Sequence, residues 1–599
     1  MSEAYSSLRM LKVSALAVVL GAFMTGVAQF LLWLINVITS LAFFGEIGRV
    51  ATSPVGNSLG FGVVVVPIVG GLIVGMMARY GSPAIRGHGI PEAMEQVLVN
   101  ASRIPARLTW LKPLSAAISI GTGGPFGAEG PIIATGGAVG SLIGQVLPAS
   151  AADRKILLAA GAAAGMAATF GSPLAALLLA VELLLFEFKA RSLVPVALAV
   201  SVATAIRAVW IGTAPVFGMP AVTAPTLEAF LTLLLLAATM GLLAFGLSRA
   251  VYLIEDTFEK LPIHWMWWPA IGAIFVGLIG YFEPRTLGVG YNNITENLAG
   301  AFSVASILAL CTLKFVSWSV ALGSGTSGGT LAPLLTIGSG LGYALGVAFH
   351  VVVPSLDVHL AALVGMACVF GGASHAILAS AVFAYETTGQ SEALFPLLAC
   401  SAVALLVVRA LGKTSIMTEK IVRRGVSVPA QYSADVFDHT LVDMVMERDV
   451  TTVPASMPLA EFASRVAGND PEFGQRQAYP VLDEAGRLVG IITRGDLVRF
   501  SEAAPPSATV LDCATKRLIV GHPRETLHAA IHKLLVHDVG RLPVVDPEDT
   551  SRLLGFLSRG AILSARWKAI EEESPGVSGW FGVKNSTPPK FKVTMEPVS

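Results

Sequence analysis

Long apolar segments dominate the first 410 residues of this chain and limit what it can fold into. A bilayer core of about 30 Å needs roughly 20 apolar residues per helix. Charged residues make up only 13% of the chain and hydrophobic residues 54%, a balance that ordinary soluble proteins do not have. We therefore predict an all-α, polytopic membrane domain over residues 1–425. Stretches of spanning or near-spanning length occur at 13–43, 60–78, 229–247, 268–281, 303–322, 333–353 and 359–383.

Charge becomes denser after about residue 415. Lys413, Lys420, Arg423 and Arg424 follow the last apolar segment, and the positive-inside rule then places the C-terminal region in the cytoplasm, with the first domain in the cell (inner) membrane. The formal net charge of zero argues against nucleic acid as a partner. The cysteines show neither metal-ligand spacing nor a disulfide framework, and no cofactor is required by the membrane domain; they are Cys311, Cys368, Cys400 and Cys513.

Two pairs of segments within the apolar region match each other. Residues 121–147 align without gaps to 323–349 at an offset of 202, and residues 161–182 align to 365–386 at an offset of 204. Shared composition is the alternative explanation, because small residues mediate close packing of membrane helices. Low-complexity similarity, however, rarely keeps a near-constant offset through two blocks. We predict a duplicated domain with an inverted internal repeat, whose substrate site lies where broken helices of the two halves meet.

Three short Gly- and Pro-containing breaks are candidates for that site: 87–91 (GHGIP), 127–131 (GAEGP) and 329–333 (GTLAP). Each ends in Pro, which suits the first turn of a helix. A helix N-terminus with closely approaching backbone N–H groups holds a monovalent anion without a full positive charge. The predicted anion-binding residues at these breaks are His88, Gly89, Ile90, Gly130, Thr330 and Leu331.

Glu129 is a lone carboxylate inside the second break. The nearest charged residues along the chain are Lys112 and Asp153. A carboxylate in such an apolar run is costly to keep in a bilayer, so it is a functional candidate by default. A structural carboxylate paired with a buried cation is the alternative.

These segments resemble the CLC chloride channels and chloride/proton antiporters, whose three signatures look like GSGIP, G(K/R)EGP and GxFxP and appear here in the same order. The resemblance covers about residues 10–425. It implies a homodimer in which each protomer has its own anion pathway, with Glu129 as the gating glutamate. Lys112 stands where similar transporters carry a lysine, as an electrostatic neighbour of Glu129 or as a snorkelling interfacial lysine.

The sequence departs from the family pattern at five positions. His88 replaces a Ser that looks like an anion ligand, and it serves either as an anion ligand or as a helix-capping residue. Ala128 replaces Arg or Lys, and Leu331 replaces Phe. Met417 stands where the family has a pore-lining Tyr. Leu183 occupies the position of the second, proton-transferring glutamate of antiporters and cannot relay a proton.

Glu182, which precedes Leu183, and its repeat partner Glu386 are expected to be structural carboxylates at helix ends.

The C-terminal region reads as two similar units, 450–505 and 506–570, after a linker at 426–449. Each unit has a helical stretch and a strand–turn pair, as in a regulatory pair of CBS domains. Thr493 and Asp496 have the form of an adenine-nucleotide site, with Asp496 as an ordinary helix cap as the alternative. Residues 571–599 are polar and are predicted to be disordered.

We therefore expect a transport protein for chloride or a similar monovalent anion, and not an enzyme. Channel-like conduction gated by Glu129 is favoured over chloride/proton antiport, because Leu183 lacks a proton-relay group. A CBS-regulated cation transporter is more remote, since the breaks offer only one carboxylate. A membrane hydrolase would need a base near Ser324 or Ser327, and none is identifiable.

Overall fold

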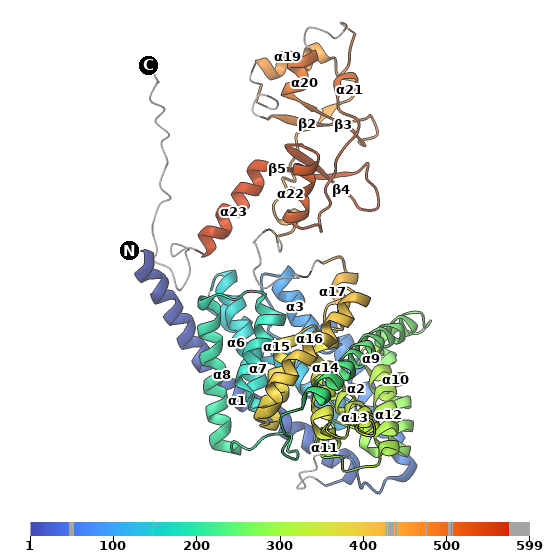
Figure 1. The fold of residues 1–599 in the computed structure, drawn as a ribbon. Helices are drawn as coiled ribbons and strands as arrows, with labels where there is room; N and C mark the ends of the chain where they lie inside the picture. Colours follow the sequence, from blue (N-terminus) through green and yellow to red (C-terminus); the bar gives the residue numbers. More distant parts are fainter. Residues whose placement is uncertain are drawn as a thin grey trace. The chain divides into compact units, whose positions relative to one another are not determined.

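The computed structural model describes residues 2–46, 53–147, 149–426, 440–468, 476–500 and 507–573, with isolated residues at 428, 437, 470–471, 473 and 505. They form two units (Figure 1), a helical one that ends at Arg423 and a second one that begins at Arg424. The predicted tail overlaps the helix α23 as far as Glu573, and the rest of it lies outside the described residues, as does most of 427–439 in the predicted linker.

The first unit is entirely helical in its regular structure. Its helices are α1 Ser2–Phe44, α2 Val65–Met76, α3 Ile90–Val99, α4 Leu108–Gly121, α5 Glu129–Val146, α6 Ala151–Phe170, α7 Pro173–Ala180, α8 Ala190–Ile211, α9 Leu227–Glu259, α10 Trp268–Phe282, α11 Tyr291–Leu298, α12 Val304–Gly323, α13 Leu331–His350, α14 Val358–Ser374, α15 Ile377–Thr388, α16 Leu394–Leu411 and α17 Glu419–Arg423.

Eight of the described helical segments are long and apolar enough to cross a membrane, which agrees with the predicted polytopic domain. The apolar stretch 359–383 is not a single membrane-spanning helix but is divided between α14 and α15. Helix α14 ends at Ser374 because His375 takes a left-handed conformation (φ 63°), and α15 starts two residues later. Gly171 ends α6 in the same way, with φ 63°, at the equivalent position of the first half.

Helix pairs α5–α6 and α13–α14 form the densely packed interior of this unit. They cross closely because glycine faces backbone at the contact: a Cβ on Gly136 would lie 2.1 Å from the Gly161 carbonyl oxygen, and one on Gly338 would lie 2.7 Å from the Gly365 carbonyl oxygen. These are the same contacts in the two halves of the repeat. Small residues allow backbones to approach in this way, and van der Waals packing then drives helix association in lipid.

A lysine clamp recurs in both halves. Lys112 Nζ, on α4, donates to the carbonyl oxygens of Ile85 (2.8 Å) and Gly87 (2.9 Å). Lys314 Nζ, on α12, lies 202 positions later and donates to those of Thr286 and Gly288, both at 2.9 Å. Each clamp holds the irregular backbone just before a short helix, α3 in one half and α11 in the other. The predicted repeat is therefore present in three dimensions.

Glu182 and Glu386 cap helices reciprocally. The carboxylate of Glu182 accepts the backbone N–H groups of Leu378 and Ala379 at the start of α15, at 3.1 and 2.9 Å. Glu386, at the end of α15, accepts those of Leu174 and Ala175 at the start of α7, at 3.0 and 2.9 Å. Helices α7 and α15 must therefore run antiparallel, as an inverted repeat requires. The prediction that both carboxylates are structural is confirmed.

The second unit is α/β and contains two small sheets. In the first, β1 (Val453–Pro454) pairs in parallel with β2 (Ala478–Leu482), which pairs antiparallel with β3 (Leu488–Thr493). In the second, β4 (Arg541–Val545) and β5 (Leu553–Ser558) are antiparallel. The helices are α19 Leu459–Ala467, α20 Arg494–Phe500, α21 Val510–Cys513, α22 Leu527–Val536 and α23 Arg559–Glu573.

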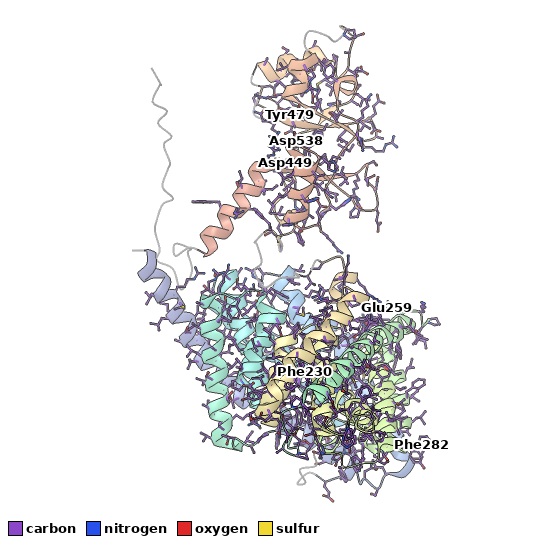
Figure 2. The ribbon with its side chains drawn as sticks, in the orientation of Figure 1. Phe230, Glu259, Phe282, Asp449, Tyr479 and Asp538 are labelled. Carbon is purple, nitrogen blue, oxygen red and sulfur yellow. The ribbon has the colours of Figure 1, made fainter. Side chains whose placement is uncertain are left out.

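Each sheet of this unit has its own apolar core. Tyr479, labelled in Figure 2, packs edge-on against Phe462 in the first core. Residues 508–513, which follow the first CBS-like unit (450–505) in sequence, also pack in this first core. The second core includes Val442 and Met446, which lie within the expected linker 426–449. The two units of the CBS-like pair thus exchange short segments at their starts.

Replacement of Glu386 by Ala is expected to lower the free energy of unfolding of the membrane unit by about 1–3 kcal/mol, because two backbone N–H groups at the start of α7 lose their acceptor. Thermal unfolding in detergent measures this, and Glu182→Ala should behave alike. Glu392, exposed near the start of α16, supplies the control: Glu392→Ala should change stability by less than about 0.5 kcal/mol. Equal effects of all three changes would contradict the capping role.

Candidate anion site

The three predicted breaks meet inside the membrane unit. Gly127 and Gly329 pair through two backbone hydrogen bonds, Gly127 N–H to the Gly329 oxygen (3.1 Å) and Gly329 N–H to the Gly127 oxygen (2.9 Å). The first break packs against them, since a Cβ on Gly130 would lie 2.0 Å from the His88 carbonyl oxygen. Helices α3, α5 and α13 therefore begin close together, and their N-terminal dipoles favour a negative charge there.

Glu129 lies at the centre of this arrangement as the first residue of α5 and is fully buried. Its Oε1 accepts a hydrogen bond from the Tyr291 hydroxyl at 3.0 Å. Its Oε2 is buried without a hydrogen-bond partner among the described residues and lies against the backbone of Gly127 and Gly329. The backbone N–H of Ala332, in the first turn of α13, and the ammonium of Lys314 both act electrostatically on this carboxylate.

Lys112 makes a different contact from the one expected. Its ammonium donates to the carbonyl oxygens of Ile85 and Gly87 and so fixes the first break. The lysine that acts on Glu129 is Lys314, its repeat equivalent. The offset of 202 that links the two halves of the sequence would have identified Lys314 from Lys112.

The other predicted anion ligands at the breaks are brought together around Glu129. Two of them carry unpartnered polar atoms within the part of the chain that the structure describes: His88 Nδ1 and Thr330 Oγ1 are buried without a hydrogen bond. Ile90 and Leu331 are fully buried at the first turns of α3 and α13. Gly89 takes a positive φ of 92° at the start of α3, a conformation that favours glycine.

Met417 lies on the segment between α16 and α17. It is fully buried, and its backbone N–H donates to Ser415 Oγ at 3.2 Å. The preceding carbonyl oxygen, that of Ile416, accepts a hydrogen bond from the Tyr252 hydroxyl at 2.8 Å. Helix α17, which follows, packs against α3. The structure thus brings this segment to the first break, while no hydrogen bond of the described residues joins it to Glu129.

Two tyrosines of this region were missed by the sequence analysis. Tyr291 follows Gly290 at the start of α11, as Ile90 follows Gly89 at the start of α3, so the two residues are equivalent although their spacing (291 minus 90) is one less than the offset of the first matched block. Tyr252 lies on α9 and reaches the Met417 segment. Only the repeat carries a sequence signal for Tyr291, and we find none for Tyr252, because its contact joins elements far apart in the chain.

Leu183 and Glu92 lie on elements that pack against each other, the π-helical turn after α7 and the helix α3. Leu183 is buried within a π-helical turn, Val181–Leu185, that continues α7. Glu92, on α3, accepts the Gly89 backbone N–H through Oε2 at 2.7 Å, while its buried Oε1 is unpartnered among the described residues. The charged or titratable side chains that act on it are Lys420, His88 and Lys112. The sequence analysis did not single out Glu92.

Thr493 and Asp496 lie together at the start of α20. Asp496 Oδ2 accepts hydrogen bonds from the Thr493 backbone N–H (2.9 Å) and hydroxyl (2.7 Å). This is the geometry of a helix cap, the alternative considered for Asp496. Nucleotide binding by the pair stays a prediction.

Comparison with known proteins identifies the family. The model of the voltage-gated chloride channel family matches residues 70–409, and that of the CBS domain matches 442–503 and 510–568. The chain belongs to the voltage-gated chloride channel (CLC) family. It is thus a multi-pass membrane protein for anion transport, and the resemblance drawn from the three breaks is confirmed. Membership also argues against the cation-transporter and hydrolase alternatives.

Curated relatives match over more than half of the chain. A putative chloride channel protein ClcB-like of Ralstonia nicotianae is 27% identical over 60% of this chain and 85% of its own length. An H⁺/Cl⁻ exchange transporter ClcA of Vibrio campbellii is 28% identical over 59% of this chain and 79% of its own.

Solved structures share the fold. A eukaryotic CLC transporter matches with a TM-score of 0.61 at 20% identity, covering 92% of this chain and 98% of its own. A slow cyanobacterial Cl⁻/H⁺ antiporter matches with a TM-score of 0.60 at 23% identity, covering 70% and 98%.

Replacement of Tyr291 by Phe removes the hydroxyl that holds Glu129 Oε1 and is expected to raise anion flux up to about tenfold at constant pH, because the carboxylate leaves its position more readily. Flux from reconstituted liposomes measures this. Tyr281, an exposed aromatic residue on α10, supplies the control, and Tyr281→Phe should leave flux unchanged. An unaltered flux in Tyr291→Phe would show that this hydrogen bond does not restrain Glu129.

Proposed function

We propose that this protein exchanges chloride for protons and that Glu129 is the group that both ions use. The observation that carries the proposal is the position of the Glu129 carboxylate, buried between the first turns of α5 and α13 where helix dipoles favour an anion. An ionised carboxylate and a chloride ion compete for such a position. The name of the 28% identical relative from Vibrio campbellii, an H⁺/Cl⁻ exchange transporter, supports the same reading.

The exchange follows from this competition. When ionised, Glu129 occupies the position between the two helix ends and blocks the anion. When protonated, it loses its attraction to the dipoles and to Lys314, and a chloride ion takes its place. The anion ligands are then the backbone N–H groups and polar atoms of the breaks, at His88, Gly89, Ile90, Gly130, Thr330 and Leu331, with Met417 toward the segment that follows α16. Several weak sites of this kind let the ion leave again.

Channel-like conduction, the reading that the sequence favours, has less support than exchange. It rests on Leu183, which cannot carry a proton. Curated relatives from several Vibrio species are named exchange transporters, and an exchanger needs only some acid–base group on the inner side. Glu92 is such a group, since its buried Oε1 has no partner among the described residues and Lys420 lies within electrostatic reach.

The membrane orientation and assembly are part of the same proposal. Basic residues gather after α16, at Lys413, Lys420, Arg423 and Arg424, which supports a cytoplasmic CBS pair and insertion in the cell (inner) membrane. Family membership supports a homodimer with one anion pathway in each protomer. Thr493 and Asp496 then present a regulatory adenine-nucleotide site to the cytoplasm.

Replacement of Glu129 by Gln is expected to abolish proton movement driven by a chloride gradient and to remove the pH dependence of chloride flux, because the neutral amide neither titrates nor competes as an anion. Liposomes with a chloride gradient and a pH-sensitive dye measure both. Glu228→Gln, at the exposed start of α9, is the matched control and should behave as the unaltered protein. Uphill proton movement that persists in Glu129→Gln would refute the proposed role.

Replacement of Glu92 by Gln tests the inner proton step. Gln still accepts the Gly89 N–H but cannot carry a proton, so proton movement should fall at least about tenfold while chloride flux persists. The ratio of the two fluxes in one preparation is the measurement. If chloride and proton fluxes fell together, Glu92 would be structural, and if neither changed, protons would take another route.

A further inference from the structure

A small apolar cluster lies where the end of α2 meets the starts of α4 and α10. Its buried members are Ala78, Ile85 and Leu111, and Trp265, just before α10, packs against them. Helix α2 passes here into a π-helical turn, Met77–Gly81, a rare feature that often marks a functional site. Helix ends from distant parts of the chain are therefore fixed next to one another.

Arg86 directly follows Ile85 and so lies at this cluster, where it stacks on two indole rings. Its guanidinium carbon is 4.9 Å from the centre of the Trp265 ring and 5.6 Å from that of Trp268, within the range of a cation–π interaction. The backbone of Gly325 adjoins the same group, since a Cβ on Gly325 would lie 2.5 Å from Arg86 Nη2. The rings and this backbone therefore hold the guanidinium in one orientation.

The Arg86 guanidinium has unused hydrogen-bonding capacity. Its Nε is buried without a partner, and no hydrogen bond or ion pair of the described residues involves the group. Glu255 and Glu259, which is labelled in Figure 2, act on it only at longer range from the end of α9, and Glu255 pairs with Lys420 at 3.6 Å. A guanidinium presents five donors in a planar fork that suits phosphate. The half-buried Arg86 is therefore expected to take an anionic ligand of this geometry.

Further basic and aromatic side chains surround Arg86. Arg107, which precedes α4, donates from Nη1 to the Gly81 carbonyl oxygen at 3.1 Å, and Arg79 is exposed on the π-helical turn. Tyr80 on the same turn and Trp267 before α10 are exposed aromatic residues. Tyrosine and tryptophan prefer the level of the lipid headgroups, and basic residues at that level attract anionic lipids.

This group of residues lies at the membrane face that the proposed orientation makes cytoplasmic. Helix α10 follows α9 after a short loop, and the same end of α9 pairs with α17 through Glu255 and Lys420 and through Asp256 and Arg423. Helix α17 lies among the basic residues that follow α16, which the positive-inside rule places on the cytoplasmic side. The lipids of that leaflet carry its negative surface charge.

We propose that Arg86, stacked on Trp265 and Trp268, is the centre of a binding site for an anionic phospholipid. The Arg86 guanidinium binds the headgroup phosphate, and Arg79 and Arg107 add positive charge at the rim. Exposed apolar side chains next to the site, such as Met76 at the end of α2, contact the acyl chains and favour a lipid over a free phosphate ion. The proposal takes only its leaflet from the proposed orientation and does not depend on chloride/proton exchange.

Native mass spectrometry of the whole protein in detergent tests this site, with phosphatidylglycerol and phosphatidylcholine of identical acyl chains as probes. The unaltered protein should retain phosphatidylglycerol in preference. Arg86→Gln should lower the ratio of the two bound lipids about fivefold, because one cation near a headgroup contributes roughly that factor. Arg86→Lys, which keeps the charge without the planar fork, should lower it less. Arg79→Gln changes only an exposed side chain, so it tests the site even if Arg86→Gln fails to fold, and should lower the ratio about two- to fivefold.

The matched control is Arg249 on α9, which stacks on Phe245 at 5.3 Å but has a carboxylate partner, Glu419, 3.8 Å away. Arg249→Gln should leave the lipid ratio unchanged. Equal retention of both lipids by the unaltered protein, or an unaltered ratio in Arg86→Gln and Arg79→Gln, would overturn the proposal. Inorganic phosphate at millimolar concentration should not displace phosphatidylglycerol, and displacement would indicate a free-phosphate site instead of a lipid site. Since no ion flux is measured, failure of the exchange proposal would leave this result standing.

Discussion

Two backbone hydrogen bonds between Gly127 and Gly329 fix the geometry of the candidate site. They join the N-termini of α5 and α13, helices that come from different halves of the chain. Inside a bilayer no water is available to satisfy such irregular backbone, so it persists only where protein covers it. The close pairing leaves the first turns of both helices facing one small volume. Glu129 occupies that volume as the first residue of α5, with its Oε1 held by the Tyr291 hydroxyl.

In the rest of the unit, charged side chains bond the free backbone groups at the other helix ends, and each such side chain has an equivalent in the other half of the repeat. Lys112 and Lys314 each saturate two carbonyl oxygens before a short helix, and Glu182 and Glu386 each accept two N–H groups at the start of one. Every unsatisfied backbone group in such a setting costs several kcal/mol. Four charged side chains therefore serve the fold first. These four residues are therefore poor candidates for transport, and Glu129, whose Oε2 has no hydrogen-bond partner among the described residues, is a better one.

The sequence predicts much of this arrangement because the internal repeat can be detected in it. The three breaks, their convergence and the capping roles of Glu182 and Glu386 follow from the glycine pattern and the constant offset. The partners of Glu129 do not follow from it. Tyr291 and Lys314 reach Glu129 through tertiary packing, whereas Lys112, the lysine named from the sequence, binds the backbone at Ile85 and Gly87.

Chemistry arises where the two halves differ. Glu129 of the first half corresponds to Leu331 of the second, and Tyr291 of the second half corresponds to Ile90 of the first. The lysine clamps, the glutamate caps and the glycines at the helix crossings are the same in both halves. A symmetric scaffold would offer an anion identical approaches from both sides of the membrane. The carboxylate of Glu129 and the Tyr291 hydroxyl that binds it have no equivalent in the other half, so the two approaches to the site differ. In the proposed exchange, a proton taken up at Glu129 opens one side to chloride while the backbone donors of α13 hold the ion.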